Sequence, residues 1–340
     1  MAVQIYIVQQ ILLLVPMLIG ITLLSFLITH AIPASPVTAN LGDRAAADPQ
    51  VVAAFRHEWG LDKPIYQQYL VYVWNLAHGN MGISIKTRQP VVKDLRQRVP
   101  ATMELAVAAM ILTVLAAIPL GMISAVNRDR LLDQVSRLVA LVGVSTPNFW
   151  LGLIAIDVFY AWLGWAPAPG ILSPIITPPP VVTGAPLLDG LIAGRWDVVT
   201  NNLWHLGLPA LVLAAYQLGV ITRMMRSSML EELGKDYVRT ARSKGLSSPS
   251  VIVKHAGRNG LIPVVTMVGL SFGALLSGTV VIETVFSWPG IGLYAFQSAG
   301  ALDFPAIMGA AIVVAAVYLV VNLAVDVAYA LLDPRIRFTA

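Results

Sequence analysis

No Asp, Glu, Lys or Arg occurs between Val3 and Gly42, and this uncharged stretch constrains the fold strongly. A membrane hydrocarbon core requires about 20 apolar helical residues to cross it, and Ile11–Ile32 meets that length. Of the 340 residues, 57% are hydrophobic and 12% are charged, against about 25% charged residues in a typical globular domain. A soluble chain would have too few charges to cover its surface, so the sequence predicts an all-α membrane protein.

Six segments are long and apolar enough to be transmembrane helices. They are Ile11–Ile32, Leu105–Asn127, Leu138–Trp165, His205–Thr222, Leu261–Ile282 and Phe304–Val325. The third is interrupted by Asp157, and the fourth is short but can extend back to Asn202. The first has no Lys or Arg before it and a long apolar run, so we expect a retained anchor instead of a cleaved signal peptide.

The distribution of basic residues among the connecting loops predicts the orientation. The loop after the second span carries three basic residues, and the loop after the fourth carries eight, between Arg223 and Arg258. The loop after the third has only Arg195, and the loop after the fifth has none. Since short cytoplasmic loops are enriched in Lys and Arg, both termini are expected in the cytoplasm. Asp43–Arg98 holds eight basic and five acidic residues, but at about 70 residues this outer segment exceeds the length over which the rule applies.

We therefore divide the chain into a first transmembrane helix (1–32), an extracytoplasmic insertion (33–100) and a five-helix core (101–340). Gly and Pro clusters at Gly60–Pro64 and Gly79–Gly82 indicate turns between short amphipathic runs of the insertion. The charges of the insertion can simply form a solvated face; the alternative is a cover over a pathway or a surface for an external binding protein. The proline-rich loop Ala166–Val182 is expected to be an irregular connector.

The segment Asp236–Pro263 is a basic stretch between the fourth and fifth spans, with five basic side chains and one acid. Asp236 can act as an N-cap, because its carboxylate can accept hydrogen bonds from the first helical turn. Gly245 suits the left-handed position that closes a helix, and Ser248-Pro249 indicates a second helix start. The pattern predicts a coupling helix within about 236–246, with Tyr237–Lys244 forming two turns about 12 Å long.

The predicted helix has one apolar face, since Tyr237 and Ala241 are four residues apart and Val238 lies beside them. We expect this face to enter a groove on a soluble partner, with Arg239, Arg242 and Lys244 at the rim. An isolated helix of this length is marginal in water, so the partner is expected to stabilise it. The alternative is a plain basic cytoplasmic loop, which would need the charges but not the helix caps.

Several blocks of the sequence resemble permease subunits of ATP-binding-cassette (ABC) importers, in particular the dipeptide, oligopeptide and nickel class. The resemblance covers the whole chain, and the blocks occur in the expected order. They are Gly60–Pro64 with Gln68-Tyr69, Gly79–Ser84, Thr102–Ala106, Ser145–Trp150, Asp236–Leu246, Glu283–Gly292 and Leu331–Arg337. The Asp236–Leu246 block is similar to the cytoplasmic motif that couples such a permease to its ATPase.

Three positions depart from the general pattern. Where the wider ABC-importer motif begins Glu-Ala-Ala, this chain has Arg239-Thr240-Ala241, and Pro263 lies further from Gly245 than the motif's terminal proline. Both departures resemble the peptide-type branch. Ala34-Ser35-Pro36 stands where Gly-Asp-Pro is usual.

The resemblance implies a permease that forms a translocation pathway for peptides together with a second permease of different sequence. It also implies two cytosolic ATP-binding subunits, an extracytoplasmic substrate-binding protein, and a location in a prokaryotic plasma (inner) membrane. ATP and Mg would bind to the partner subunits, and this chain would bind no cofactor or metal and catalyse no reaction; it has no Gly-x4-Gly-Lys-Ser/Thr phosphate loop. The implied ATPase-coupling residues are Asp236, Tyr237, Arg239, Thr240, Ala241, Arg242, Lys244, Gly245 and Leu246.

Polar groups within the spans are candidates for lining the pathway, because a charge facing lipid is costly. The deepest acid is Asp157, which we expect to face the pathway or the partner permease. Further candidates are Asn148, Gln217 and Ser271, although hydrogen bonds between helices are an equal alternative. We expect Glu104, Glu283 and Asp326, which lie nearer span ends, to make structural pairs.

Three other functions compete with the importer hypothesis. A buried acid also suits a proton-coupled secondary transporter, which would not need a capped cytoplasmic helix. The five histidines form no metal-binding spacing, and no Gly-x-Ser-x-Gly elbow occurs, so an intramembrane enzyme would need a Ser–His pair assembled from distant segments. Nucleic-acid binding by Asp236–Arg258 is disfavoured because both flanks enter the membrane. The sequence leaves the cargo open among dipeptide, longer peptide, nickel chelate and another small solute.

Overall fold

The computed structural model describes residue 12 and residues 16–27, 47–58 and 63–332. These residues are predominantly helical, and their one extended pairing is an isolated antiparallel bridge between Ile83 and Pro90. The predicted all-α class is confirmed for this part of the chain. The expected first span, Ile11–Ile32, is described mainly as the helix Pro16–Leu27, and the remainder lies outside the described residues.

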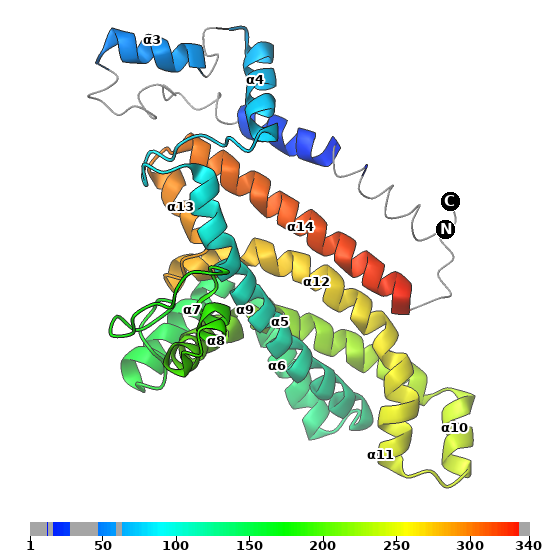
Figure 1. Ribbon diagram of the computed structural model, residues 1–340. Helices are drawn as coiled ribbons and strands as arrows, with labels where there is room; N and C mark the ends of the chain where they lie inside the picture. The colour runs from blue at the N-terminus through cyan, green and yellow to red at the C-terminus, as the bar shows by residue number, and fades with distance from the viewer. Residues whose placement is uncertain (1–11, 13–15, 28–46, 59–62, 333–340) are drawn as a thin grey trace.

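After Pro16–Leu27, the helices follow one another along the chain (Figure 1). They are α3 (Pro49–Glu58), α4 (Ile65–Ala77), α5 (Val91–Val126), α6 (Leu131–Ser145), α7 (Asn148–Ala155), the π-helix η1 (Ile156–Trp162), α8 (Pro186–Ile192), α9 (Trp196–Leu233), α10 (Asp236–Ser243), α11 (Ser248–Ser250), the π-helix η2 (Val251–Gly257), α12 (Arg258–Val285), α13 (Ile291–Gly300) and α14 (Phe304–Leu332).

Four described stretches are long and apolar enough to cross a membrane: α5, α9, Ser248–Leu276 and Phe304–Leu323. They contain or overlap the second, fourth, fifth and sixth predicted spans. α5 begins well before the predicted start at Leu105, and its first turns belong to the segment expected as an extracytoplasmic insertion. The number of spans rises to five if one bent helix pair is counted as a single span.

That bent pair corresponds to the third predicted span, Leu138–Trp165. In place of one continuous helix, α6 and the α7–η1 segment meet at 106°. Thr146 is extended, with φ −92° and ψ 125°. It precedes Pro147, and the proline ring disfavours the helical conformation of the preceding residue, which explains why α6 ends at Ser145.

α9 lies at the centre of the helix packing, where it contacts α5, α6, α7 and α12. Its crossing with α6 is especially close, because glycine from each helix faces backbone of the other. A Cβ added at Gly143 would lie 2.4 Å from the Ala215 carbonyl oxygen, and one added at Gly219 would lie 2.4 Å from that of Ala140. Small residues allow membrane helices to approach in this way. One buried apolar cluster joins α5, α7, α9 and α12, and a second joins α5, α9, α10, η2 and α12.

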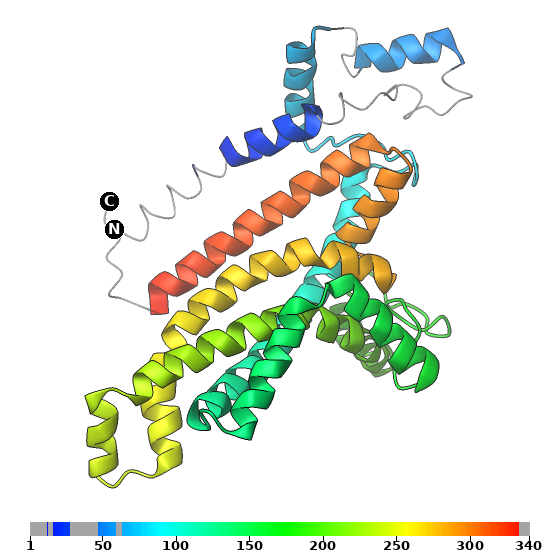
Figure 2. The same cartoon turned by 180° about the vertical axis from the view of Figure 1, so that it is seen from behind.

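The two polar regions expected from the sequence lie at opposite ends of the molecule. α3 and α4 lie at one end, and α10 and α11 lie at the other (Figures 1 and 2). α4 contacts the helix Pro16–Leu27, since the Tyr69 and Thr22 hydroxyls are 3.0 Å apart and the rings of Phe26 and Tyr69 meet edge to face. The segment between Trp162 and Pro186 contains neither helix nor strand, as expected for the proline-rich loop.

Candidate functional site

The predicted coupling segment forms a short helix, α10, with a defined end. Gly245 is left-handed, with φ +78°. The Gly245 N–H donates to the Arg242 carbonyl at 2.9 Å and the Leu246 N–H to the Ala241 carbonyl at 3.4 Å. These two bonds are the pair expected when a glycine terminates a helix in a Schellman motif. The prediction that Gly245 closes the helix is therefore confirmed.

The beginning of α10 differs from the prediction. Asp236 is the first helical residue, the N-cap position belongs to Lys235, and no side-chain hydrogen bond caps this end. The Asp236 carboxylate is exposed and lies 3.5 Å from Arg239 in an ion pair. The prediction that Asp236 is the N-cap was thus wrong. An acid in the first turn still complements the positive end of the helix dipole. At the next helix, Ser247 is the N-cap and Pro249 follows Ser248 inside the first turn.

The apolar face of α10 lies against the chain itself. Val238 is fully buried and Ala241 is 6% exposed. Both belong to the cluster that includes Met229 of α9 with Val251 and Ala256 of η2. The expectation that this face would enter a groove on a partner was therefore wrong: the face is already covered, because burial within the chain removes the same apolar surface from water.

A polar network also holds α10 in place. The Tyr237 hydroxyl donates to Glu232 at 2.5 Å and accepts from the Asn259 amide at 3.1 Å. Lys235 binds the other oxygen of Glu232 at 2.6 Å. Burial, with the neighbouring Glu232 carboxylate, raises the pKa of the Tyr237 phenol, so this hydroxyl remains a proton donor at neutral pH. Since Glu232 is on α9 and Asn259 on α12, the network joins α10 to both long helices without any partner protein.

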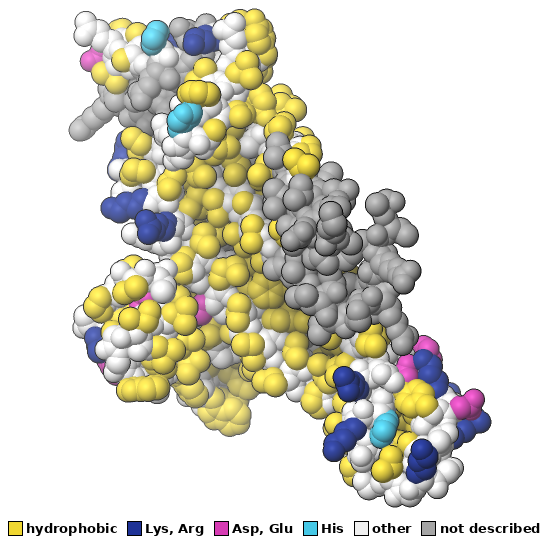
Figure 3. All heavy atoms as spheres, turned by 45° about the vertical axis from the view of Figure 1, so that its right-hand side comes forward, with side chains coloured by type: hydrophobic (Ala, Val, Ile, Leu, Met, Phe, Trp, Pro, Cys, Tyr) yellow, Lys and Arg dark blue, Asp and Glu magenta, His cyan; other side chains and the backbone are white. Residues whose placement is uncertain are grey.

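The opposite face of α10 remains available for a partner. It presents a set of exposed coupling candidates: Asp236, Arg239, Thr240, Arg242, Lys244, Gly245 and Leu246. Figure 3 shows Lys and Arg side chains gathered at this end of the molecule. A small, rigid, basic surface is suited to binding a complementary protein surface, since opposite potentials direct association and fix the register.

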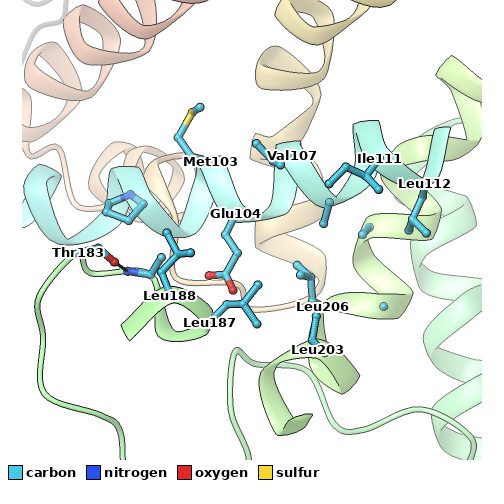
Figure 4. A pocket seen from close by; sticks show the side chains of 15 residues that line it. Met103, Glu104, Val107, Ile111, Leu112, Thr183, Leu187, Leu188, Leu203 and Leu206 are labelled. Atoms are coloured by element: carbon cyan, nitrogen blue, oxygen red, sulfur yellow. Dashed lines mark hydrogen bonds between the residues drawn. The ribbon is translucent and has the colours of Figure 1, made fainter. Parts of the chain in front are cut away.

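The four pathway candidates are not brought together. Asp157 is exposed on η1, Asn148 is half-buried at the start of α7, and Gln217 and Ser271 are buried on α9 and α12. None of them lines the cavity between α5, α8 and α9 (Figure 4) or the cavity between α7, α9 and the proline-rich loop. In one chain they do not form a site, and their role in a pathway stays a prediction.

The acids expected in structural pairs behave differently from one another. Glu283 is fully buried and accepts hydrogen bonds from Thr102 at 2.7 Å and from the Leu293 N–H at 3.0 Å, which confirms the expectation. Both carboxylate oxygens of Glu104 are buried; the Leu187 N–H and the Asn202 side chain lie near them, but at no short hydrogen-bond distance. A signal was present in the sequence: none of the residues three or four positions from Glu104 is basic. The side chain of Asp326 lies outside the described residues.

A Ser–His pair does form, between the proline-rich loop and α9. Ser173 Oγ lies 3.0 Å from His205 Nε2, and His205 Nδ1 lies 3.1 Å from the Gly170 carbonyl oxygen. The Ser173 hydroxyl also accepts from Asn201 at 2.9 Å. No carboxylate orients the imidazole in this arrangement, in contrast to a catalytic triad, and the bonds anchor the loop to α9. Among the described residues, no group of three His, Asp or Glu side chains is placed to hold a metal ion.

Comparison with known proteins gives a consistent result along the chain. Residues 117–338 match the family described as "Binding-protein-dependent transport system inner membrane component", and residues 3–106 match its N-terminal counterpart. The chain is 48% identical over 317 residues to the probable D,D-dipeptide transport system permease protein DdpB of Escherichia coli, covering 93% of each protein. It is 45% identical to the di/tripeptide permease protein DppB of Pseudomonas aeruginosa over 98% of each. It is 36% identical to the glutathione permease protein GsiC of Escherichia coli, covering 98% of this chain and 99% of GsiC.

Proposed function

Because this chain belongs to the family of inner-membrane components of binding-protein-dependent transport systems, we propose that it is the permease subunit of an ATP-driven importer of short peptides. The peptide cargo is supported by relatives of similar length that are named for dipeptides, tripeptides and glutathione. The chain would supply half of a translocation pathway, and a second permease, different in sequence, would supply the other half.

The observation that carries this proposal is the position of α10. One face of α10 is fixed inside the chain by Val238 and Ala241, and the other is exposed and basic. A partner that binds the exposed face therefore acts on α9, η2 and α12 together, because α10 packs against η2 and its Tyr237 hydroxyl is hydrogen-bonded to Glu232 of α9 and Asn259 of α12. Rigid displacement of packed helices is a common way to switch a protein between two states, and here it would alternate access to the pathway.

The complete assembly follows from the same proposal. Two cytosolic ATP-binding subunits, which carry ATP and Mg, would bind the α10 surfaces of the two permeases, and an extracytoplasmic binding protein would deliver the peptide at the end that carries α3 and α4. The chain would cross a prokaryotic inner membrane six times with both termini in the cytoplasm. The opposite placement of α4 and α10 supports this orientation (Figure 1).

The coupling proposal is tested on exposed residues only. Arg239→Glu combined with Arg242→Glu reverses two charges of the α10 surface without touching the Tyr237 network or the buried face. We expect loss of ATPase subunits on co-purification and loss of peptide-stimulated ATP hydrolysis, with normal membrane insertion. The matched control is Arg130→Glu, which reverses an exposed charge on the loop between α5 and α6. Full retention of coupled transport in the double variant would refute the role of α10.

Asp157 is proposed to face the pathway or the partner permease, since an exposed carboxylate on a helix as apolar as α7–η1 is costly against lipid. Asp157→Asn should reduce peptide uptake while leaving assembly with the ATPases intact. Asn148→Ala, Gln217→Ala and Ser271→Ala test the remaining candidates in the same way. Unaltered uptake in Asp157→Asn would reject its proposed role.

A proton-coupled secondary transporter is the second candidate, and the buried Glu104 carboxylate favours it. The two functions are separated by the energy source. In sealed vesicles, an ATP-driven importer takes up peptide only with ATP and its ATPase subunits, and uptake persists when a protonophore collapses the proton gradient. Uptake that requires the gradient and not the ATPases would establish the second candidate.

A further inference from the structure

In the proposed orientation, the chain carries an excess of basic residues on the outer side of the membrane, where few are expected. Residues 79–100 hold five basic residues and one acid, and residues 286–303 hold one acid and no basic residue. The two segments meet in space: the start of α5 lies beside α13, at the end of the molecule that carries α3 and α4 (Figures 1 and 2). Membrane topology does not account for this concentration of positive charge.

Both acids of this region point inward and hold its parts together. Asp94 is 6% exposed and accepts hydrogen bonds from the Thr87 hydroxyl at 2.5 Å and from the Tyr294 hydroxyl at 3.1 Å. Asp303, between α13 and α14, is fully buried and accepts from the Ser84 hydroxyl at 2.6 Å. These bonds fasten the loop before α5 to α13. They also leave no carboxylate of either segment on the surface to neutralise the basic side chains.

Four basic side chains lie on the outside of the same region. We call them the outer basic surface: Lys86, Arg88, Lys93 and Arg96, all of them exposed. Within the part of the chain that the structure describes, none of the four forms an ion pair; the Lys86 ammonium donates to the Gln297 side-chain oxygen at 2.6 Å. Lys93 and Arg96 are three residues apart and therefore share one face of α5.

The position of Lys93 and Arg96 on α5 is electrostatically unfavourable for the isolated chain. Both lie in the first two turns of the helix, where the positive end of the helix dipole repels a cation. A surface that combines exposed cations with this end of a helix attracts negative charge. It therefore suits a partner that presents carboxylates or phosphates.

The length of α5 indicates that this partner lies outside the bilayer. The helix has 36 residues and is about 54 Å long, whereas a bilayer with its headgroups is about 40–45 Å thick. The predicted span on α5 begins at Leu105, about 18 Å along the helix from Lys93, but the headgroup layer of one leaflet is only about 5–8 Å thick. A helix tilt of about 20° does not remove this difference. The outer basic surface therefore projects beyond the headgroups, within reach of a soluble protein.

We propose that the outer basic surface is the docking surface for the extracytoplasmic binding protein, which would present a matching cluster of carboxylates. The proposal rests on the proposed importer function and deepens it, because it names the residues that receive this partner. Opposite potentials accelerate association and fix the orientation of the bound protein. Since Asp94 and Asp303 tie the loop to α13, a protein docked there acts on α5 and α13 together.

The test reverses two charges of the outer basic surface in Lys93→Glu combined with Arg96→Glu. The fold should be retained, because both side chains are exposed and acids are favourable in the first turns of a helix. The matched control is Arg56→Glu combined with Lys63→Glu, which reverses two exposed charges at the same end of the molecule, on α3 and before α4. The complete transporter would be studied in phosphatidylcholine nanodiscs, and the probe is the binding protein of the same transport system, loaded with Leu-Ala.

The association rate constant of the binding protein is measured at about 50 and about 300 mM salt, because the screening length shortens between these concentrations. For the wild type we expect association to be about tenfold slower at the higher salt. The double variant should associate about tenfold more slowly than the wild type at low salt and lose little more at high salt. The control should behave like the wild type. In vesicles, the double variant should need about tenfold more binding protein for half-maximal uptake of Leu-Ala and should reach the wild-type maximum.

Unchanged association in the double variant would refute the docking surface. An equal loss in the control would assign the effect to the net charge of the outer end instead of this surface. If the double variant binds the binding protein normally but is no longer stabilised by phosphatidylglycerol in thermal unfolding, the surface binds anionic lipid and the proposal is wrong. ATP-dependent uptake of Leu-Ala by the wild type separates the two proposals: uptake together with normal association in the double variant refutes only the docking surface, and absence of uptake refutes the importer.

Discussion

Thr102 Oγ1 donates a 2.7 Å hydrogen bond to Glu283 Oε1, across 181 residues of sequence. The same hydroxyl oxygen accepts the Ile291 N–H at 2.8 Å, and the second Glu283 oxygen accepts the Leu293 N–H at 3.0 Å. One threonine and one carboxylate thus join α5, α12 and the start of α13 in a fully buried position. Gly292 is required there, because a Cβ would lie 2.4 Å from the Val280 Cα and 2.9 Å from the Glu283 carboxylate.

Thr102→Val should destabilise the protein by about 2 kcal/mol, because it removes a bond to a buried carboxylate and leaves the Ile291 N–H without its acceptor. The measurement is thermal unfolding in detergent. Thr113→Val is the control: Thr113 is equally buried on α5, but its hydroxyl bonds only to the Ala109 carbonyl of its own helix. The control should lose less than about 1 kcal/mol. Equal losses of unfolding free energy in the two variants would show that the hydrogen bond from Thr102 to Glu283 adds no stability.

The sequence predicted the features that depend on local chemistry. Gly245 ends α10 as expected, since a left-handed position strongly favours glycine. Four of the predicted spans were found because a run of about 20 apolar residues is a strong signal. The break at Pro147 also had a local signal, because a proline disfavours the helical conformation of the residue before it. The continuous hydropathy of the two flanking helices nevertheless led to the prediction of a single span.

The features that depend on tertiary contacts were not predictable. The face of Tyr237, Val238 and Ala241 was correctly identified as apolar, but its cover proved to be η2 and α9, which are close in space only after folding. Glu104 and Glu283 are similar in sequence context, both being acids within an apolar segment. Only the fold shows that Glu283 has donors at short hydrogen-bond distance and that Glu104 does not.

The close crossing of α6 and α9 gives a prediction about glycine. Gly219→Ala should destabilise by about 1–3 kcal/mol, because the added Cβ would lie 2.4 Å from the Ala140 carbonyl oxygen and the helices would have to separate. Gly207→Ala on the same helix has open space around its Cβ position, so it should be neutral or stabilising by up to about 1 kcal/mol. Chemical unfolding of both variants tests this prediction. Similar changes in the free energy of unfolding would contradict the close crossing of α6 and α9.

A pH effect is expected at Asp189 in α8. Burial tends to raise the pKa of this carboxyl, but hydrogen bonds from Thr183 at 2.7 Å and from the Gly184 N–H at 3.0 Å outweigh it and hold the pKa below its usual value. The folded pKa is thus below the unfolded one of about 3.9. The resulting stability is present above that pH and is lost as the pH falls through the folded pKa.

Asp189→Asn should therefore be less stable than the wild type at pH 7, and the difference should begin to narrow below about pH 4, where the carboxylate of the unfolded chain is protonated before that of the folded chain. Thermal unfolding at pH 7 and pH 3 measures this change. Asp197→Asn, which removes an exposed carboxylate paired with Arg195, should change the stability little at either pH, because water screens an exposed ion pair. A difference for Asp189→Asn that stays constant with pH would refute the assignment.

The buried pair of Asp133 and Arg226 joins α6 to α9 near the α10 end. The Asp133 side chain is fully buried, and Arg226 donates to its two oxygens at 2.7 and 2.8 Å. Ser124 and the Asp129 N–H supply two more donors, at 2.5 and 2.9 Å. Arg226→Leu leaves a buried carboxylate without its cation, so we expect a loss of about 3–5 kcal/mol.

Arg137→Leu is the matched control, because Arg137 also faces Asp133 but lies 3.9 Å away with half of its side chain exposed. That variant should lose less than about 1 kcal/mol. The double change Asp133→Leu with Arg226→Leu should recover much of the stability lost in Arg226→Leu, since replacing a whole buried pair by apolar residues is often tolerated. If the double variant is less stable than either single one, Asp133 stabilises this region through Ser124 and the Asp129 backbone more than through Arg226.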